Sequence, residues 1–218
     1  MPIMCDLGGK HDHFGFLVDT PEIRALVDET ERLRREVFED ADRVERLKPI
    51  FARLLSAEGW LPDAYARPDS KSGMGGGIGQ YALYRASDGS LCLFSLVIPP
   101  GARTPVHDHL AWGLVGLYRG TQDEELYEPG DGSLRRVRQR PLQPGDYYTL
   151  LPPREDIHRV RTTSDVTSVS IHLLANDTGC VARHTYDEQT GAARPFRSGY
   201  VNADCEDGPI VAAEDRAG

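Results

Sequence analysis

The sequence predicts a mainly β protein, a sandwich or a barrel, preceded by two α-helices. Short apolar runs separated by turn signals follow one another at close intervals from residue 80 to about residue 186. Two longer stretches before residue 60 instead repeat their apolar residues at helical spacing. Glycine (22 residues) and proline (15 residues) are both frequent, which suits a turn-rich β protein. At 218 residues, the chain fits one domain, or one domain with an N-terminal extension.

The first predicted helix begins at Thr20-Pro21-Glu22. This triplet combines a hydroxyl N-cap, a proline at the first helical position and an acid in the first turn. The apolar spacing continues to about residue 38, and a second helical pattern runs from about Asp42 to Ala57. Because each pattern has one apolar face, we expect both helices to pack against the outside of the β domain as scaffold.

The domain division follows from these patterns. We assign residues 1–60 to a helical extension, 61–79 to a glycine-rich connection, 80–202 to the β domain and 203–218 to a flexible polar tail. The glycine cluster at 73–79 leads into a strand and not into a helix, so we interpret it as a flexible loop and not as a phosphate-binding loop. Whether it acts as a lid stays open. The predicted strands are 80–86, 91–98, 111–119, 122–128, 134–141, 146–151, 157–163, 166–174 and about 180–186.

Composition and charge exclude several partners. The formal net charge of −9 argues against nucleic-acid binding, which needs clustered lysine and arginine. No stretch approaches the roughly 20 apolar residues of a membrane span, and the N-terminus lacks the pattern of a signal peptide. The four cysteines are scattered without a CxxC motif, so we expect reduced thiols and a cytoplasmic protein. Cys92 lies in an apolar run and is predicted to be a core residue.

Two histidines form the most informative motif. His107 and His109 lie two apart in a segment that reads as a strand, so both imidazoles can point to one face and bind one metal ion. Pro105 stands where it opens a strand. A second such pair, His11 and His13, lies in a polar segment with no strand pattern, and we interpret it as solvated.

The frame around His107 and His109 resembles the first motif of the cupin family: Gly101, five residues, the histidine pair, then Gly113 and Gly120. A later stretch, with Gly145-Asp146 and then His158, resembles the second cupin motif, in which a histidine closes the metal site. His158 is therefore the predicted third ligand. In most cupins a glutamate follows the pair by four residues, where this chain has Gly113. The resemblance thus implies a cupin barrel whose metal is held by three neutral imidazoles.

Within the cupins, the segment HDHLAWGLVGLYRGTQDEELY resembles the iron-dependent thiol dioxygenases, above all the bacterial 3-mercaptopropionate dioxygenase branch. The resemblance runs from about Gln80 to Arg183 and is densest at 105–128. It implies one Fe(II) per chain and oxidation of a small thiol acid to its sulfinate by O2. An ion with three neutral ligands keeps its double charge, which suits a substrate that brings its own thiolate.

Further positions follow from the resemblance. The family pairs a serine and a histidine two apart near the bound ligands, as in Ser170 and His172. The mercaptopropionate branch also uses an arginine to receive the substrate carboxylate, for which Arg183 is the candidate here. It has a glutamine before a tyrosine on the first barrel strand, matching Gln80-Tyr81. We add Trp112, beside the histidine pair, as a candidate substrate contact or core residue.

One position departs from the family. The family's serine and histidine continue to a tyrosine, where this chain has Leu174, unless Tyr81 or Tyr84 supplies the phenol. The cysteine of the family's Cys–Tyr crosslink falls in the stretch 112–114, which contains no cysteine, so no crosslink is expected. A bulkier or less polar thiol acid is a reasonable substrate. Another metallocupin enzyme, such as an isomerase or a carbon–carbon-cleaving dioxygenase, and a non-catalytic binding cupin stay open, as does the oligomeric state.

Overall fold

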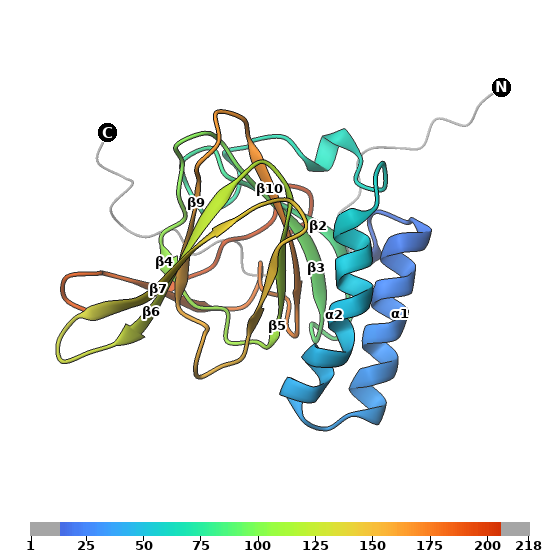
Figure 1. Cartoon of the computed structure of the whole chain (residues 1–218), viewed down its shortest axis with the longest axis horizontal. Helices are drawn as coiled ribbons and strands as arrows, with labels where there is room; N and C mark the ends of the chain where they lie inside the picture. Colours follow the sequence, from blue (N-terminus) through green and yellow to red (C-terminus); the bar gives the residue numbers. More distant parts are fainter. Residues whose placement is uncertain (1–13, 206–218) are drawn as a thin grey trace.

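The computed structural model describes residues 14–205, which form two helices packed on two antiparallel sheets (Figure 1). The helices are α1 (Pro21–Glu36) and α2 (Asp40–Ser56), and a 3-10 turn, η1, spans Asp63–Tyr65. The strands are β1 (Gly15–Phe16), β2 (Gly79–Arg85), β3 (Cys92–Ile98), β4 (Val106–His107), β5 (Gly113–Arg119), β6 (Gln122–Pro129), β7 (Leu134–Leu142), β8 (Tyr147–Leu150), β9 (His158–Thr162), β10 (Ser168–Leu174), β11 (Arg183–Tyr186) and β12 (Ala193–Phe196).

The strands alternate between the two sheets. One sheet has the order β1-β2-β3-β10-β5-β8 and the other has the order β12-β11-β4-β9-β6-β7. From β3 to β6, and again from β7 to β10, consecutive strands lie in opposite sheets. Both sheets are antiparallel throughout, and the interior lies between them. The predicted mainly β cupin barrel with two helices outside it is confirmed.

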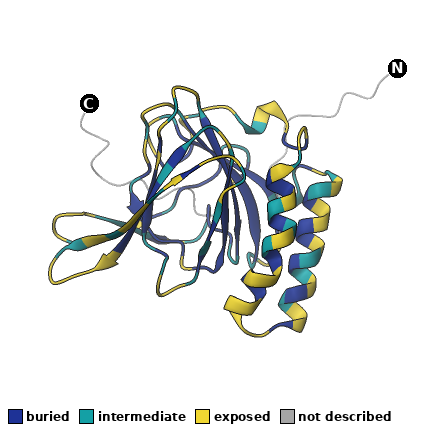
Figure 2. Cartoon of the chain, viewed as in Figure 1, coloured by how far each residue is buried: buried dark blue, intermediate teal, exposed yellow. Residues whose placement is uncertain are grey.

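Helix α1 begins where the sequence predicts. Thr20 is the N-cap, and its hydroxyl accepts a hydrogen bond from the backbone nitrogen of Ile23 at 3.3 Å. Pro21 occupies the first helical position, where a missing N–H costs nothing. The buried apolar residues of both helices belong to the cluster packed on the first sheet. Most other helix residues are exposed or half-buried (Figure 2), although Arg43 of α2 is buried. The helices therefore cover one face of that sheet, as predicted.

Two apolar clusters divide the barrel wall. The outer cluster joins the helices to residues of the first sheet that point away from the second sheet, such as Leu83, Leu114 and Ile171. The inner cluster fills the space between the sheets, with Phe94, Val115 and other residues. The side chains of each strand alternate between the two clusters, so neighbours in sequence lie on opposite sides of the sheet.

Three short strands are absent from the predicted set. β1 has two residues, too few for a period-two pattern to be recognised. β4 also has two residues, and the strand expected through the histidine pair ends at His107, so His109 lies in the loop that follows. β12 contains Arg194 and Pro195, which are unfavourable in strands, and it pairs only with β11 at the sheet edge. The glycine loop has positive φ at Gly75, Gly76 and Gly77. No helix among residues 14–205 is both long enough and apolar enough to cross a membrane.

The prediction of reduced cysteines is wrong for one pair. Cys180 and Cys205 form a disulfide that ties the end of the described chain to the loop between β10 and β11. Their sequence separation of 25 residues gives no motif, so only the fold brings them together. The disulfide also fixes the position of Cys205, a residue that the sequence analysis assigns to the flexible tail. Cys92 is a buried free thiol, as predicted. His11, His13 and residues 206–218 lie outside the described residues.

Candidate metal centre

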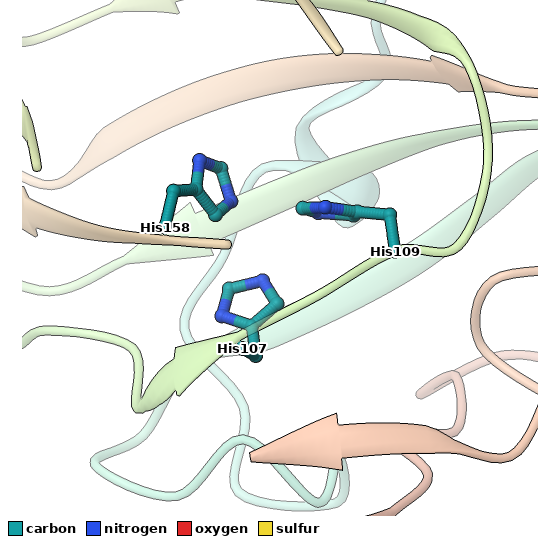
Figure 3. Close-up of side chains that lie close together, drawn as sticks. All are labelled: His107, His109 and His158. Atoms are coloured by element: carbon teal, nitrogen blue, oxygen red, sulfur yellow. The ribbon is translucent and has the colours of Figure 1, made fainter. Parts of the chain in front are cut away.

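Three histidines meet inside the barrel. His107 ends β4 and is the cross-strand partner of His158, which begins β9, while His109 follows two residues after His107 (Figure 3). The ring centroids are 4.9 Å (His107 to His109), 4.8 Å (His107 to His158) and 4.7 Å (His109 to His158) apart. Each offers a nitrogen to one cluster whose ligand atoms lie within 4.8 Å of one another. The three predicted ligands thus form a compact triangle.

A hydrogen-bond acceptor lies beside the Nδ1 atom of each histidine. The Nδ1 atom of His107 is 2.9 Å from the carbonyl oxygen of Pro105, and that of His109 is 3.2 Å from Asp156 Oδ1. The Nδ1 atom of His158 is 3.2 Å from the hydroxyl of Tyr148. A proton on each Nδ1 leaves the Nε2 lone pairs for a metal ion. His158 Nε2 is buried and has no hydrogen-bond partner in residues 14–205, as expected of a nitrogen that binds a metal ion.

Burial keeps two of these rings uncharged. The pKa of His107 and that of His109 lie well below the ordinary value, because burial disfavours the cation and because Arg183 adds positive charge nearby. A neutral imidazole is the form that binds a metal. The donor set of three imidazole nitrogens therefore fits a divalent transition metal, and no carboxylate joins the cluster within residues 14–205.

Two buried aspartates hold the ligand loop, and the sequence analysis identified neither. Asp156 accepts backbone hydrogen bonds from His109 at 2.9 Å and from Leu110 at 3.0 Å, which stabilise the positive φ of 57° at Leu110. Asp108 accepts from the backbone nitrogen of His184 at 2.8 Å and from the Tyr186 hydroxyl at 2.8 Å. These contacts join segments that are about 50 and 75 residues apart. Only the spacing of Asp156 two residues before His158 could have suggested a role.

Gly113 cannot be replaced by the glutamate that most cupins have at this position. A Cβ atom at this position would lie 2.2 Å from the carbonyl oxygen of Leu173 and 2.4 Å from Leu174 Cδ2. Gly113 is the cross-strand partner of Leu174, so the position of the glutamate of most cupins faces the position of the tyrosine of the thiol dioxygenases across β5 and β10. The side chain of Leu174 takes up part of the space that a side chain at position 113 would need.

Arg183 lies in the interior, near the histidines. Its guanidinium donates to the carbonyl of Asp108 at 2.8 Å and to the Ser198 hydroxyl at 2.9 Å, and it lies over the ring of Phe196 at 4.7 Å. None of its hydrogen bonds within residues 14–205 goes to a carboxylate. Burial lowers its pKa to about 10, so it stays charged at neutral pH. His184, the next residue, is half-exposed and points the other way.

Ser170, His172 and Gln80 also point into the interior. The Ser170 hydroxyl is 2.9 Å from His172 Nε2, and the His172 ring stacks on Phe94 with centroids 4.5 Å apart. Burial, with the nearby positive charge of Arg183, holds the pKa of His172 well below its usual value. Gln80 and Ser170 are both cross-strand partners of Leu96, so they share one row of the sheet. Gln80 Nε2 and His172 Nδ1 are buried and have no hydrogen-bond partner in the described chain.

The structure does not bring Tyr81 and Trp112 to this cluster. Both belong to the outer cluster, where the Tyr81 hydroxyl donates to the carbonyl of Arg67 at 2.9 Å and Arg43 of α2 lies over the Trp112 ring. Tyr84 also faces outward, against Phe16. Neither tyrosine replaces the missing phenol at Leu174. The phenol beside one of the three histidines is that of Tyr148. The sequence analysis missed it because β8 and β9 lie in different sheets, and only the packing of the two sheets brings Tyr148 to His158.

No family model matches the sequence. The chain is similar to a solved structure of an uncharacterized conserved protein with a double-stranded β-helix domain from Klebsiella pneumoniae. The identity is 13%, the match covers 53% of this chain and 81% of that chain, and the TM-score is 0.41. It is also similar to the DMSP lyase DddQ from Ruegeria pomeroyi, at 26% identity over 46% of this chain and 47% of that chain, with a TM-score of 0.36.

A third similar structure is the cupin domain of Cnp3 from Schizosaccharomyces pombe, at 13% identity over 46% of this chain and 62% of that chain, with a TM-score of 0.37. This chain therefore spans about half the length of the lyase structure and less than two thirds of the Cnp3 domain structure. The strand order of its own two sheets and the site between them define the class: a cupin barrel whose interior carries a three-histidine cluster able to hold a metal.

Proposed function

We propose that the protein is an Fe(II)-dependent thiol dioxygenase. In this reaction a small carboxylate-bearing thiol of the 3-mercaptopropionate type and one O2 give a sulfinate and a proton. The carbon–sulfur bond stays intact, both oxygen atoms join the sulfur, and no further reductant is consumed. The observation that carries the proposal is the presence, in one interior, of three neutral imidazoles and a buried guanidinium without a carboxylate partner in residues 14–205.

The charges of this interior favour a dianionic substrate. Three neutral ligands leave the double positive charge of a bound ion uncompensated, and Arg183 adds a further positive charge. A thiolate beside the ion and a carboxylate beside Arg183 would compensate both. A guanidinium can bind a carboxylate through two parallel hydrogen bonds, and it is more weakly hydrated than an ammonium group. The proposed substrate thus supplies the negative groups that the protein interior lacks.

The chain's own residues would bind and orient the substrate. Arg183 would hold the carboxylate, and the unpaired amide of Gln80 offers a donor on the same interior face. His172, fixed by Ser170 and by stacking on Phe94, offers its free Nδ1 as a donor or an acceptor. The iron would supply the redox chemistry that joins oxygen to sulfur. Placement of one sulfur atom by fixed groups is the protein's contribution to the rate.

Leu174 favours a second candidate, a cupin that binds a thiol acid without oxidising it. Without a phenol at this position, the described interior has lost a hydrogen-bond donor that the resembling enzymes contribute beside the substrate. Such a protein would take up the metal and the thiol acid and consume no O2. Other metallocupin chemistry, isomerisation or carbon–carbon cleavage, would likewise give no thiol-dependent O2 consumption.

The test is O2 uptake by iron-loaded protein with 3-mercaptopropionate, cysteine, cysteamine and bulkier mercapto acids, followed by identification of the sulfinate. We expect uptake with the thiol acids, and none when Zn(II) replaces iron. Arg183→Lys keeps the charge but loses the planar pair of donors, so KM for thiol acids should rise by about 10-fold or more, with a smaller change in kcat. Cysteamine, which has no carboxylate, serves as the control substrate. One iron per chain without uptake for any thiol would contradict the proposal.

A further inference from the structure

A buried carboxylate lies behind the third metal ligand and has no part in the function proposed above. Glu124 lies on β6, which pairs with β9, and its side chain is 1% exposed. Its Oε1 atom is 3.6 Å from Nδ1 of His158 and has no hydrogen-bond partner within residues 14–205. A buried oxygen without a donor is costly to a folded protein. Its position next to an imidazole therefore calls for an explanation.

One oxygen of Glu124 is paired and the other is not. The Nε atom of Arg140 donates to Glu124 Oε2 at 2.9 Å, and the same guanidinium lies over the ring of Tyr148 at 4.5 Å. A carboxylate that is paired with a guanidinium only accepts further hydrogen bonds. The ring nitrogen that faces Oε1 is Nδ1 of His158, at 3.6 Å.

The Nδ1 atom of His158 can be a donor to Oε1 in one tautomer only. With the proton on Nδ1, the ring offers N–H to the acceptors around it, which are Glu124 Oε1 and the Tyr148 oxygen. In the same tautomer the Nε2 atom, buried and without a partner in the described chain, has its lone pair free and directed toward His107 and His109 (Figure 3). The opposite tautomer would leave both Glu124 Oε1 without a donor and Nε2 unable to bind a metal.

We propose that Glu124 is a positioning residue of the metal centre. It holds His158 in the metal-binding tautomer. It also places a negative charge behind that ring, whereas in most cupins a glutamate at the position of Gly113 carries the charge. A carboxylate behind a ligand imidazole fixes the ring and makes it a stronger donor. The space at Gly113 is closed to any side chain, since its Cβ would meet backbone at 2.2 Å. The charge stands one imidazole away from the ion, which leaves positions on the ion open for a substrate.

The acceptors at the other two ligands differ from Glu124. The Nδ1 atom of His107 faces a neutral carbonyl oxygen, that of Pro105. The Asp156 carboxylate, 3.2 Å from His109 Nδ1, also accepts two backbone hydrogen bonds of the ligand loop. Glu124 Oε1 is the carboxylate oxygen beside the three rings that no other donor in residues 14–205 uses. Removal of the Glu124 charge therefore tests one ligand without releasing the backbone of the ligand loop.

The experiment measures metal affinity directly, by competition of Zn(II) and Co(II) against a chelator, in Glu124→Gln and in a matched control. Glu125→Gln is that control, because Glu125 is the next residue on β6 and binds Arg159 and Arg136 on the other side of the strand. We expect Glu124→Gln to weaken binding of both ions by about 10- to 100-fold and to shift the Co(II) absorption bands, with Glu125→Gln unchanged. Tyr148→Phe removes the other oxygen beside His158 Nδ1, that of the Tyr148 hydroxyl. It should weaken metal binding less than Glu124→Gln does.

A Glu124→Gln affinity within about threefold of the wild type overturns the proposal, as does a loss that only Tyr148→Phe shows. A second measurement needs no variant: the ¹⁵N resonances of His158 in the metal-free protein at pH 7 should show a proton on Nδ1, and a proton on Nε2 overturns it. The inference rests on the three-histidine metal site of the proposed function but not on thiol oxidation. Zn(II) and Co(II) binding can therefore support it even if no thiol consumes O2.

Discussion

The two faces of the β1–β8 sheet are made of alternating residues of the same strands, yet they differ in chemistry. On the outer face, Tyr81 and Ile171 pack with the helices, and the polar tip of Tyr81 is hydrogen-bonded. On the inner face, Gln80 and His172 bury polar nitrogens that have no hydrogen-bond partner in residues 14–205. In Figure 2 the strands of this sheet are coloured as buried along most of their length, so burial alone does not separate the residues of the two faces.

The difference teaches where this fold keeps its reactive groups. A buried polar atom without a partner lowers stability, so proteins contain few of them unless a ligand, an ion or a water completes the set. The inner face and the adjoining second sheet hold four such atoms within the described chain, on Gln80, His172, His158 and Glu124. Two more, on Arg43 and Trp60, lie among the side chains packed over the outer face. Because the inner atoms include a candidate metal ligand and its neighbours, we expect the inner face to determine binding and the outer face to determine stability. The following predictions test this division.

The largest expected effect is on stability and comes from the outer face. Phe51 of α2 is fully buried against β5, so Phe51→Ala should lower the free energy of unfolding by about 3–5 kcal/mol. Zn(II) affinity of the folded protein should stay unchanged, because the ring lies on the helix side of the sheet. Chemical denaturation and chelator competition on the same preparation measure the two quantities. A parallel fall in affinity would show that the two faces are coupled.

The second effect belongs to the inner face and depends on pH. The pKa values of His107, His109 and His172 lie well below that of an unfolded histidine, about 6.5, so below that pH the unfolded chain binds protons that the folded chain does not. The stability of the metal-free protein should therefore be full above about pH 6.5 and fall as the pH drops, by up to about 1.4 kcal/mol per pH unit for each histidine.

Urea unfolding of chelator-treated protein between about pH 5.5 and 7.5 measures this slope, and His172→Gln should reduce it. Asp156 acts in the opposite sense at lower pH, because burial raises its pKa and the folded state then holds the extra proton. A slope of zero across this range would contradict neutral histidines in the interior.

The smallest effects should have opposite signs at two adjacent residues. Tyr81→Phe removes the hydrogen bond to Arg67 and should cost about 1 kcal/mol of stability, with KM for the thiol acid unchanged. Gln80→Leu removes an unpaired buried amide and should be neutral or stabilising by up to about 1 kcal/mol, with a raised KM. Thermal unfolding of both variants measures the change in stability, and steady-state kinetics measure the change in KM. The reverse pattern would place the substrate contact on Tyr81.

Several features were predictable because they depend on local chemistry. The hydroxyl and proline at Thr20-Pro21 start a helix by themselves, and the nine predicted strands correspond to β2, β3 and β5–β11 because turn residues separate apolar runs. The paired histidines could be recognised because two residues apart in an extended segment share a face. His107 and His109 were selected on this spacing and Arg183 on the resemblance to the thiol dioxygenases, and the fold places all three in one interior.

Other features depend on which strands become neighbours, and that is a property of the whole barrel. Tyr81 and Trp112 stand beside interior residues in sequence, but the side of the sheet on which each points follows from strand register. Glu124 reaches His158 because β6 pairs with β9, and Cys180 reaches Cys205 because the chain returns to that loop. The sequence by itself determined the helices, the strands and the histidine pair. Only the tertiary structure decided which buried polar groups surround them, because contacts between distant segments leave no local pattern.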